Sequence, residues 1–507
     1  MIKRILCLSL ALLLALGALV GCKKGAEDST ADGTVSTQDT GADEEKLTIL
    51  EGVNYGGKVV TIHVRGDDGS INEIGMESYG DILSDALYRR TVTTEERIGV
   101  DVEISIHEPY GTYNKAITEL RNSITAQEGT YDIVAGWSCR IVPLTTEGIF
   151  HDLKSTAYYN SEDEWWSSTI TDALTVGGKI YLNTGDIAAS YMDSCMAIAV
   201  NQKVAKDFGY DYDSFYDIVD SGEWTMEYFN QLVKDAYHDE NGNSIRDEQD
   251  KFGLVGIHTD GDAFWAASNI SIIDNNGTDR PSLSFNVEKV QGMVDKVYTL
   301  FYDNIGAEIA SDKAGVSVFA DSDATRAHFQ KDLAMFTMVS LGGLADLSTM
   351  ETVYGVLPMP KYDADQKDYR TYVQQGMSLW CIPVDVADKD MSSAVMTSLG
   401  FDSRQDVIEV HYETVLKIRY VKDTTSGYMI DLIYNNVFMN FDSLFNEALA
   451  ESVSKKYRVN MPVYVIRNME SELQSGKTNI QAWWASNETG LTTRLNAILD
   501  GYFGAAE

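Results

Sequence analysis

Short apolar runs alternate with longer segments of helical periodicity in the folded part of the chain. A β-rich run over 57–64 precedes apolar residues at helical spacing over 81–98, and alternating apolar and polar positions predict a second strand over 100–104. A helical stretch over 113–124 then leads to a short strand of the buried type over 131–135. This order of strands and helices predicts an α/β fold in which crossover helices connect parallel strands.

The later part of the chain adds more strands and a helical end. Ligands bind beyond the carboxyl ends of the strands in open parallel sheets, so we expect a site at the residues that follow the first and third strands, 65–67 and 136–138. From residue 391 onward the sequence is helical with few breakers. Apolar runs bounded by turn residues predict further strands over 178–182, 196–201, 333–339, 354–361 and 377–382.

The N-terminus carries the pattern of an export signal. Lys3 and Arg4 form a short basic region, and the apolar run over 5–16 is too short for a membrane-spanning helix, which needs about 20 apolar residues. The stretch Leu19-Val20-Gly21-Cys22 resembles the lipobox of bacterial lipoproteins, which implies cleavage before Cys22 and a diacylglycerol on its sulfur. A secretory signal with a chance cysteine is the alternative. Lipidation of Cys22 predicts a protein anchored on the extracytoplasmic face of the cell membrane.

The composition limits the partners that the protein can bind. The 507 residues carry a formal net charge of −37, and such a surface repels nucleic acid and anionic membranes. We therefore expect no nucleic-acid partner and no membrane contact besides the lipid anchor. Residues 22–46 are small and acidic with almost no large apolar side chain, which predicts a flexible tether.

Sequence signatures of zinc sites and of catalysis are missing. The five cysteines include no C-x-x-C pair, and no Cys/His cluster has zinc spacing. The motifs G-x-S-x-G, H-E-x-x-H, G-x-x-x-x-G-K-[ST] and G-x-G-x-x-G are also absent from the sequence. We therefore expect a protein that is not an enzyme and has no organic cofactor. A glycosidase pair of carboxylates is defined by spatial separation and leaves no such signature.

The sharpest local motif is the acidic loop HDENGNSIRDEQDKFG over 238–253. Its oxygen donors fall at positions 1, 3, 5, 7, 9 and 12 of a loop, the spacing that surrounds Ca²⁺ in an EF-hand. Ser244 replaces the usual glycine and Asp250 the bidentate glutamate, so the pattern resembles the dockerin-type calcium loop more than the standard one. A solvated acidic turn built on Asn-Gly is the alternative. The predicted ligands of a structural Ca²⁺ are Asp239, Asn241, Asn243, the carbonyl of Ile245, Asp247 and Asp250.

Six short segments, in order along the chain, carry a family resemblance. They are EERIGVDVEI at 95–104, YDIVAGW at 131–137, GGKIYLNTGD at 177–186, IAVNQKVAKDFG at 198–209, SGEWTMEYF at 221–229 and YGVLPMPK at 354–361. Together they resemble the extracellular solute-binding proteins of family 1, the lipoprotein receptors of ABC importers for sugars. The resemblance implies a two-lobed periplasmic-binding-protein-like fold of type II, in which each lobe is a mostly parallel sheet flanked by helices. It also implies binding of a solute between the lobes and its delivery to ABC permease subunits.

The division of the chain follows from the same resemblance. The expected parts are a signal peptide at 1–21, the tether at 22–46, the first part of lobe 1 at 47–184, the first part of lobe 2 at 185–373, a return to lobe 1 at 374–430, and C-terminal helices, mainly of lobe 2, at 431–507.

A receptor for sugars needs planar aromatic rings to cover the sugar faces, and charged or amide groups to bind the hydroxyls on the rim. For each residue chosen on this basis, core packing or loop exposure is the alternative. Trp224 precedes Thr225, a residue type that caps helices, and is expected in the core. The predicted ligand-binding residues are Arg65, Asp67, Trp137, Tyr191, Trp265 and Ser340.

Two other functions compete with transport. One is a lipid-anchored, carbohydrate-active surface enzyme, which would release reducing ends from polysaccharides. The other is a sensor subunit that presents its ligand to a membrane kinase without transport.

Overall fold

The computed structural model describes residues 47–65, 73–75, 80, 82–107, 113–311, 317–411, 424–449 and 479–504. These residues belong to one compact unit, which begins at Leu47. The predicted signal peptide, the tether with Cys22, and Asp67 lie outside the described residues. Their assignments stay predictions.

One sheet gathers the strands of the first third of the chain. Its order is β11-β3-β1-β2, in which β1 pairs parallel with both β2 and β3, and β11 pairs antiparallel with β3. Helices α1 and α13 pack against each other beside it. We call this sheet and the elements packed on it lobe 1. Its strands are β1 (Lys58–Arg65), β2 (Val100–His107), β3 (Ile133–Trp137) and β11 (Ser378–Cys381), and its main helices are α1 (Ile82–Ile98), α2 (Tyr113–Ala126), α3 (Ser138–Ile141), α4 (Ser168–Leu174) and α13 (Lys389–Asp402).

A second sheet gathers strands from the middle of the chain. Its order is β10-β4-β9-β5-β8, with antiparallel pairing from β10 to β9 and parallel pairing from β9 to β8. We call this sheet and its helices lobe 2. Its strands are β4 (Met196–Asn201), β5 (Phe252–Ile257), β8 (Ala307–Ala310), β9 (Ala334–Ser340) and β10 (Tyr354–Leu357).

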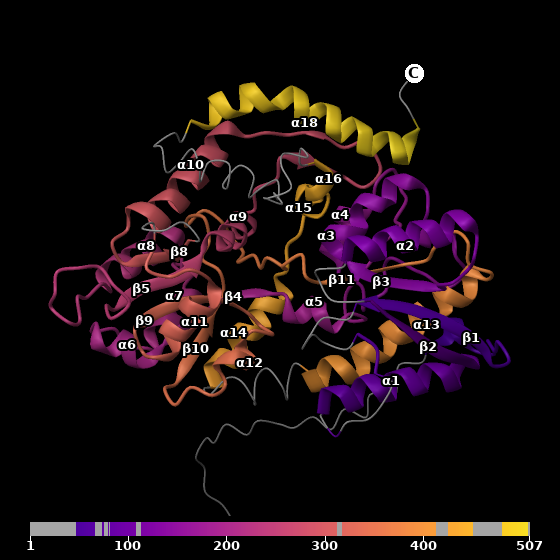
Figure 1. Ribbon diagram of the computed structural model, residues 1–507, viewed down its shortest axis with the longest axis horizontal. Coiled ribbons are helices and arrows are strands. Elements are labelled where there is room, and N and C mark those ends of the chain that lie inside the picture. The colour runs from indigo at the N-terminus through magenta and orange to yellow at the C-terminus, as the bar shows by residue number, and fades with distance from the viewer. Residues whose placement is uncertain are drawn as a thin grey trace, which may run out of the picture. The chain divides into compact units, whose positions relative to one another are not determined.

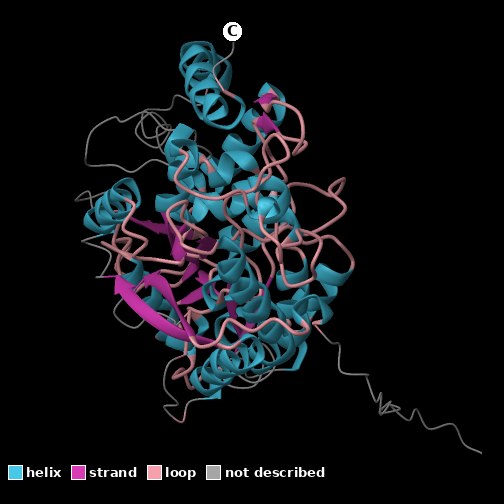
Figure 2. Cartoon of the chain, turned by 90° about the vertical axis from the view of Figure 1, so that its right-hand side faces the viewer, coloured by secondary structure: helices cyan, strands magenta, loops and turns pink. Residues whose placement is uncertain are grey.

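Helices flank the sheets, as Figure 2 shows from the side of lobe 1, and several of them contact the strands of lobe 2. They include α8 and α11 against β5, α6 against β9, and α7 and α14 against β10. The hairpin of β6 (Ile273–Asp274) and β7 (Ser282–Leu283) projects from this lobe. The helices are α6 (Gln202–Asp207), α7 (Ser214–Asp220), α8 (Met226–Asp235), α9 (Gly261–Ala267), α10 (Val287–Tyr298), α11 (Ser322–Gln330), α12 (Leu344–Leu347) and α14 (Thr424–Asn435).

Several short elements lie within the lobes or between them, and α5 leads from lobe 1 into β4 of lobe 2 (Figure 1). The last helices, α15, α16 and α18, contact elements of both lobes. The short elements and the last helices are η1 (Thr48–Leu50), η3 (Val142–Glu147), η4 (Leu153–Ser155), α5 (Ala189–Asp193), η5 (His258–Asp260), η6 (Thr299–Asp303), η7 (Ser403–Val407), α15 (Phe441–Leu444), α16 (Asn446–Leu449) and α18 (Ile480–Phe503).

Two crossings of the chain between the sheets run side by side. The segment that ends in α5 leads into β4, and the segment over 371–377 leads from lobe 2 back to β11. Cys195 and Val373 form an isolated antiparallel bridge, and the amide of Gln374 donates to the carbonyl of Ser194 at 2.8 Å. Backbone hydrogen bonds thus hold the two crossing segments together.

Local chemistry explains several of the helix starts. The hydroxyl of Thr225 accepts a hydrogen bond from the amide of Tyr228 at 3.3 Å, which confirms the predicted N-cap of α8. Trp224 is fully buried, and its indole Nε1 donates to the carbonyl of Pro358 at 2.8 Å. The prediction that Trp224 lies in the core is confirmed.

The predicted strand over 178–182 is wrong. Gly177 and Gly178 have positive φ angles of 58° and 75°, which form a tight turn that closes on the bridge between Val176 and Lys179. Beyond it, Asn183 makes only an isolated bridge to Trp380 on β11. The aliphatic residues of this run, Ile180 and Leu182, are fully buried. The run nevertheless forms no continuous series of hydrogen bonds with a neighbouring strand in the described part of the chain.

The two-lobed α/β fold is confirmed, with sheets that mix parallel and antiparallel pairs. None of the helices in the described residues is both long and apolar enough to cross a membrane.

Candidate ligand-binding site

Two predicted residues meet at the carboxyl ends of β1 and β3. Arg65 ends β1 and Trp137 ends β3, and the guanidinium lies 5.2 Å from the centroid of the indole ring. Both side chains donate to the carbonyl of Gly376: Trp137 through Nε1 at 2.9 Å and Arg65 through Nη1. Neighbouring parallel strands therefore bring these residues together as the sequence predicted, at the edge where such sheets bind ligands.

The crossing segment over 371–377 completes this cluster. Ser138 donates its amide to the carbonyl of Met377 at 3.0 Å and its hydroxyl to the carbonyl of Gln375 at 2.8 Å. A Cβ on Gly376 would lie 3.8 Å from the hydroxyl of Ser194 and 3.9 Å from Nε1 of Trp137. The edge of the indole thus lies beside both crossing segments.

Tyr191 lies on α5, inside the first crossing segment. Its side chain is buried, its hydroxyl donates to Ser167 at 3.0 Å, and its ring meets that of Tyr434 edge-on at 5.9 Å. Burial raises the pKa of Tyr191 well above the ordinary value for tyrosine. Tyr191 therefore stands as a neutral packing and hydrogen-bonding group in this arrangement of the lobes.

Asp186, which sequence reasoning did not single out, joins three elements next to Tyr191. Its carboxylate accepts from the hydroxyl of Tyr434 on α14 at 2.7 Å and from Nη1 of Arg404 on η7 at 3.0 Å. Burial raises its pKa, although the hydrogen bonds from Tyr434 and Arg404 oppose the shift. The crossing segment is thereby tied to lobe 1 through Arg404 and to lobe 2 through Tyr434.

Ser340 ends β9 and starts a turn toward the first crossing segment. Its hydroxyl accepts from the amide of Gly343 at 3.1 Å, and the amide of Gly342 donates to the carbonyl of Asp193 at 3.0 Å. The carboxylate of Asp193 in turn lies 2.8 Å from Nε2 of His411, with both side chains largely buried. The predicted position of Ser340 at a strand end is confirmed, and the structure adds His411 and Asp193 beside it.

Trp265 is 1% exposed and packs in the interior of lobe 2. The polar groups at this strand end are instead the carboxylates of Asp260 and Asp262, which follow β5. Asp260 accepts from the amide of Ile257 at 2.8 Å, while burial and the neighbouring charge of Asp262 raise the pKa of Asp260 to about 7. The sequence held a signal for these carboxylates: an apolar run over 252–257, typical of a buried strand, is followed by charged residues.

No family model and no curated protein matches the chain. Among solved structures, a cyclo/maltodextrin-binding protein complexed with maltotetraose shares 14% identity at a TM-score of 0.54, over 90% of this chain and 100% of that one. An ABC substrate-binding protein from Listeria monocytogenes in complex with cycloalternan shares 12% identity at a TM-score of 0.52, over 89% of this chain and 100% of that one. This chain has the fold of ABC substrate-binding proteins. The family resemblance stated from the sequence agrees with these neighbours, which are binding proteins.

The acidic loop on the substrate-binding-protein fold closes on itself through its own polar groups. The carboxylate of Asp239 accepts from the amides of Gly242 at 2.8 Å and Ser244 at 2.7 Å. The side-chain amides of Asn241 and Asn243 both reach the carboxylate of Asp247, Asn243 at 2.7 Å. Ile245, whose carbonyl is a predicted ligand, has a side chain that is 63% exposed.

Asp250 differs from the other members of the loop because it is fully buried. Its Oδ2 accepts from the amide of Asp247 at 3.1 Å and from the hydroxyl of Tyr237 at 3.0 Å, whereas Oδ1 meets no hydrogen-bond partner within the described residues. Within that same part of the chain, no three acidic, His or Cys side chains gather closely enough to hold a metal ion. The loop thus contains one buried oxygen without a hydrogen-bond partner among the described residues, Oδ1 of Asp250. Its other carboxylates would have to move closer together to bind one ion.

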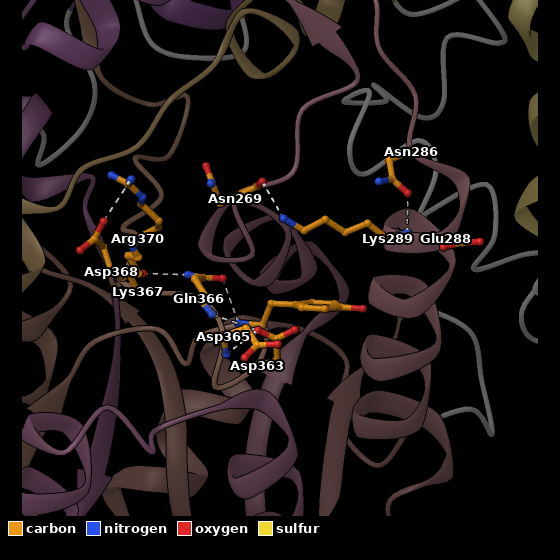
Figure 3. Close-up of a pocket in the computed structure, with 11 residues that line it drawn as sticks. Asn269, Asn286, Glu288, Lys289, Asp363, Asp365, Gln366, Lys367, Asp368 and Arg370 are labelled. Atoms are coloured by element: carbon orange, nitrogen blue, oxygen red, sulfur yellow. Dashed lines mark hydrogen bonds and ion pairs between the residues drawn. The ribbon is translucent and has the colours of Figure 1, made fainter.

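A cavity of about 640 Å³ opens elsewhere on lobe 2, between α10 and the loop over 362–370 (Figure 3). Its charges are mixed and several of its polar groups bond to each other: Lys289 donates to the carbonyl of Asn269 at 3.1 Å, and the side-chain amide of Gln366 donates to the carbonyl of Asp368 at 2.8 Å. None of the predicted ligand-binding residues lines it. The lining residues are Asn269, Asn286, Glu288, Lys289, Tyr362, Asp363, Asp365, Gln366, Lys367, Asp368 and Arg370.

Proposed function

We propose that the protein binds a carbohydrate or related solute between its two lobes and delivers it to an ABC permease. The observation that carries the proposal is the pair of Arg65 and Trp137, which parallel strands bring together beside both crossing segments. An indole supplies a flat apolar surface for the C–H face of a sugar, and a guanidinium supplies fork-shaped donors for its hydroxyls. The neighbours of the same fold bind maltotetraose and cycloalternan, which supports this solute class.

Lobe movement would couple binding to delivery. A ligand that contacts both lobes favours the arrangement in which they close, since its affinity differs between the open and closed states. The shared carbonyl of Gly376 links the ligand-facing residues to the crossing segment, so closure would adjust both together. The proposed activity is binding and release without bond cleavage.

Calorimetry against a panel of oligosaccharides, polyols and phosphodiesters tests the proposal. Trp137→Ala is expected to weaken binding about tenfold or more, because an aromatic anchor in a binding site contributes over 1 kcal/mol. Tyr362→Ala, which changes the separate cavity on lobe 2, is the matched control and leaves the Kd unchanged. Binding to no member of the panel, or release of reducing ends from polysaccharides, would contradict the proposal.

We also propose that Cys22 carries the lipid that holds the protein beside its permease at the extracytoplasmic face of the cell membrane. The support is the lipobox-like stretch at Leu19-Val20-Gly21-Cys22. Cells grown with labelled fatty acid are expected to label the wild-type protein and not Cys22→Ser. Label that persists in the variant would show the assignment to be wrong.

A structural Ca²⁺ in the acidic loop is a further part of the proposal. The buried Oδ1 of Asp250 supports it, because a buried carboxylate oxygen without a partner is costly and a hard cation would satisfy it. Asp239, Asn241, Asn243, the Ile245 carbonyl, Asp247 and Asp250 would hold the ion and fix the loop between α8 and β5.

Thermal unfolding in excess Ca²⁺ and in a chelator tests this ion. Stabilisation of about 2.7 kcal/mol is expected at a Ca²⁺ concentration one hundred times the Kd, and it should be lost in Asp250→Asn. Glu248→Gln, an exposed change in the same loop away from the ligand positions, should keep the response. An equal melting temperature of the wild-type protein in Ca²⁺ and chelator would remove the ion from the proposal.

A further inference from the structure

The long terminal helix α18 is attached to both lobes. It has 24 residues, which corresponds to about 36 Å at 1.5 Å per residue, and Asn479 caps its start by accepting from the amide of Ala482 at 2.9 Å. In Figure 1 it runs in yellow from the side of α10 toward the side of α4. It contacts α10 of lobe 2, η3 of lobe 1 and α16 between them.

Its N-terminal end is fixed on lobe 2. The ring of Trp484 stacks on Phe285 with centroids 3.9 Å apart and planes 5° from parallel. The amide of Ile480 donates to the side chain of Gln291 on α10 at 2.9 Å, and Ile480 itself is fully buried. Stacking, burial and a satisfied helix-start amide together form a firm anchor.

Its C-terminal end is fixed on lobe 1. Nζ of Lys179 donates to the carbonyl of Tyr502 at 3.2 Å, and the ring of Tyr502 lies 5.2 Å from that of Tyr181. Phe503 lies so close to the tight turn that a Cβ on Gly177 would come within 2.8 Å of its ring. The lysine at this end also matches the negative end of the helix dipole.

The hairpin of β6 and β7 reinforces the same contact. From lobe 2 it reaches the end of α4, where Nδ2 of Asn275 donates to the carbonyl of Thr175 at 3.1 Å and the carbonyl of Gly277 accepts from the amide of Gly178 at 2.8 Å. Arg280 of the hairpin then pairs with Asp500 of α18 at 2.7 Å. The turn of lobe 1 is therefore held between two elements that are rooted in lobe 2.

We infer that α18 and the β6–β7 hairpin act as a brace that limits how far the lobes separate when no ligand is bound. A continuous helix anchored at both ends resists a change in the distance between its anchors, so opening must release one of them. The inference rests on the proposed function, since it concerns the movement that would admit and release the solute. It gives the C-terminal helices a role in regulating that site: the brace keeps the lobes of the empty protein near the arrangement described here, which reduces the free energy lost in ordering them when a ligand binds.

Distances between spin labels on the two lobes of the full-length protein test the brace. Lys115 on α2 and Lys331 after α11 are exposed and can each be replaced by a ketone-bearing amino acid for labelling, which avoids the native cysteines. Without ligand, the unaltered brace should give a narrow distance distribution. Release of the lobe 1 anchor in Lys179→Met/Phe503→Ala should broaden it and shift it to longer distances, and Trp484→Ala should do the same from the lobe 2 end.

Thr492→Ala is the matched control, because Thr492 lies on α18 and is exposed. Its distribution should equal that of the unaltered brace, and circular dichroism checks that each variant is folded. The inference is overturned if folded anchor variants keep the narrow distribution, or if the unaltered protein is already as broad as they are. Because no ligand enters this measurement, its outcome is independent of whether the proposed solute binds.

Discussion

At the scale of single residues, burial decides the chemistry of this protein more than residue type does. Asp260 and Asp186 are carboxylates with raised pKa values, and burial is the first cause in both. Trp265 and Trp137 are equally suitable for stacking by type, yet one is in the interior of lobe 2 and the other ends a strand. A sequence presents each side chain with its ordinary properties, and the surroundings then shift them.

The free energy of unfolding should depend on pH through the protonation of Asp260. Its folded pKa of about 7 lies above the ordinary value of about 3.9, so the folded state binds the proton more tightly than the unfolded chain. The resulting stabilisation is fully present below pH 4 and is lost as the pH rises through 7. Asp260→Asn, which can still accept from the amide of Ile257, should flatten this part of a plot of unfolding free energy against pH. An unchanged slope in the variant would contradict the assignment.

At the scale of elements, two glycines differ in how closely other parts of the chain approach them. A Cβ on Gly253 of β5 would lie 2.1 Å from the carbonyl oxygen of Val233, at the end of α8. Gly490, in the middle of α18, would meet only the side chain of Arg494 at 3.5 Å. The same residue type therefore serves close packing in one element and weakens the other.

Alanine at these two glycines should act in opposite directions. Gly253→Ala is expected to destabilise the protein by about 3 kcal/mol or more, because backbone atoms have to move. Gly490→Ala should stabilise it by about 0.5–1 kcal/mol through helix propensity. Chemical denaturation of both variants measures the changes, and a loss of stability in Gly490→Ala would show that the middle of α18 is more tightly packed than described.

The observed strands show which predictions the hydrophobic pattern alone can support. Strands over 58–65, 133–137 and 196–201 match the predicted runs closely, because each is apolar, short and bounded by turn residues. The run over 178–182 has the same composition but no partner strand, so it forms a turn with isolated bridges. Periodicity predicts that a segment is buried, whereas only a neighbour in space makes it a strand.

At the scale of the whole molecule, the lobes are joined by polar contacts as well as by the chain. Asp186 binds Arg404 of η7 and Tyr434 of α14, and α18 spans α10 and η3. Both connections join distant parts of the sequence: Asp186 and Arg404 are 218 positions apart, and Gln291 of α10 and Ile480 of α18 are 189 apart. The angle between the lobes therefore depends on contacts that no local pattern encodes.

The pair of Asp186 with Arg404 should matter more than a fully exposed one, because its carboxylate side is buried. Asp186→Asn is expected to cost about 1.5–3 kcal/mol of unfolding free energy, because it weakens the hydrogen bonds of a buried carboxylate at the junction of three elements. Asp406→Asn removes the exposed pair with Arg89, whose side chains are 53% and 41% exposed, and should cost less than about 1 kcal/mol. Equal losses for the two variants in denaturant melts would contradict this ranking.

The sequence by itself determined the order of the main strands and helices, the α/β class, and the meeting of Arg65 with Trp137. It could do so because parallel strands place consecutive carboxyl ends at one edge, whatever the details of packing. Only the tertiary structure decided that the crossing segments pair and that Trp265 is buried. It also decided that Oδ1 of Asp250 has no hydrogen-bond partner within the residues described and that α18 contacts both lobes. Each of these depends on contacts between distant parts of the chain, and such contacts are set by the packing of the whole fold.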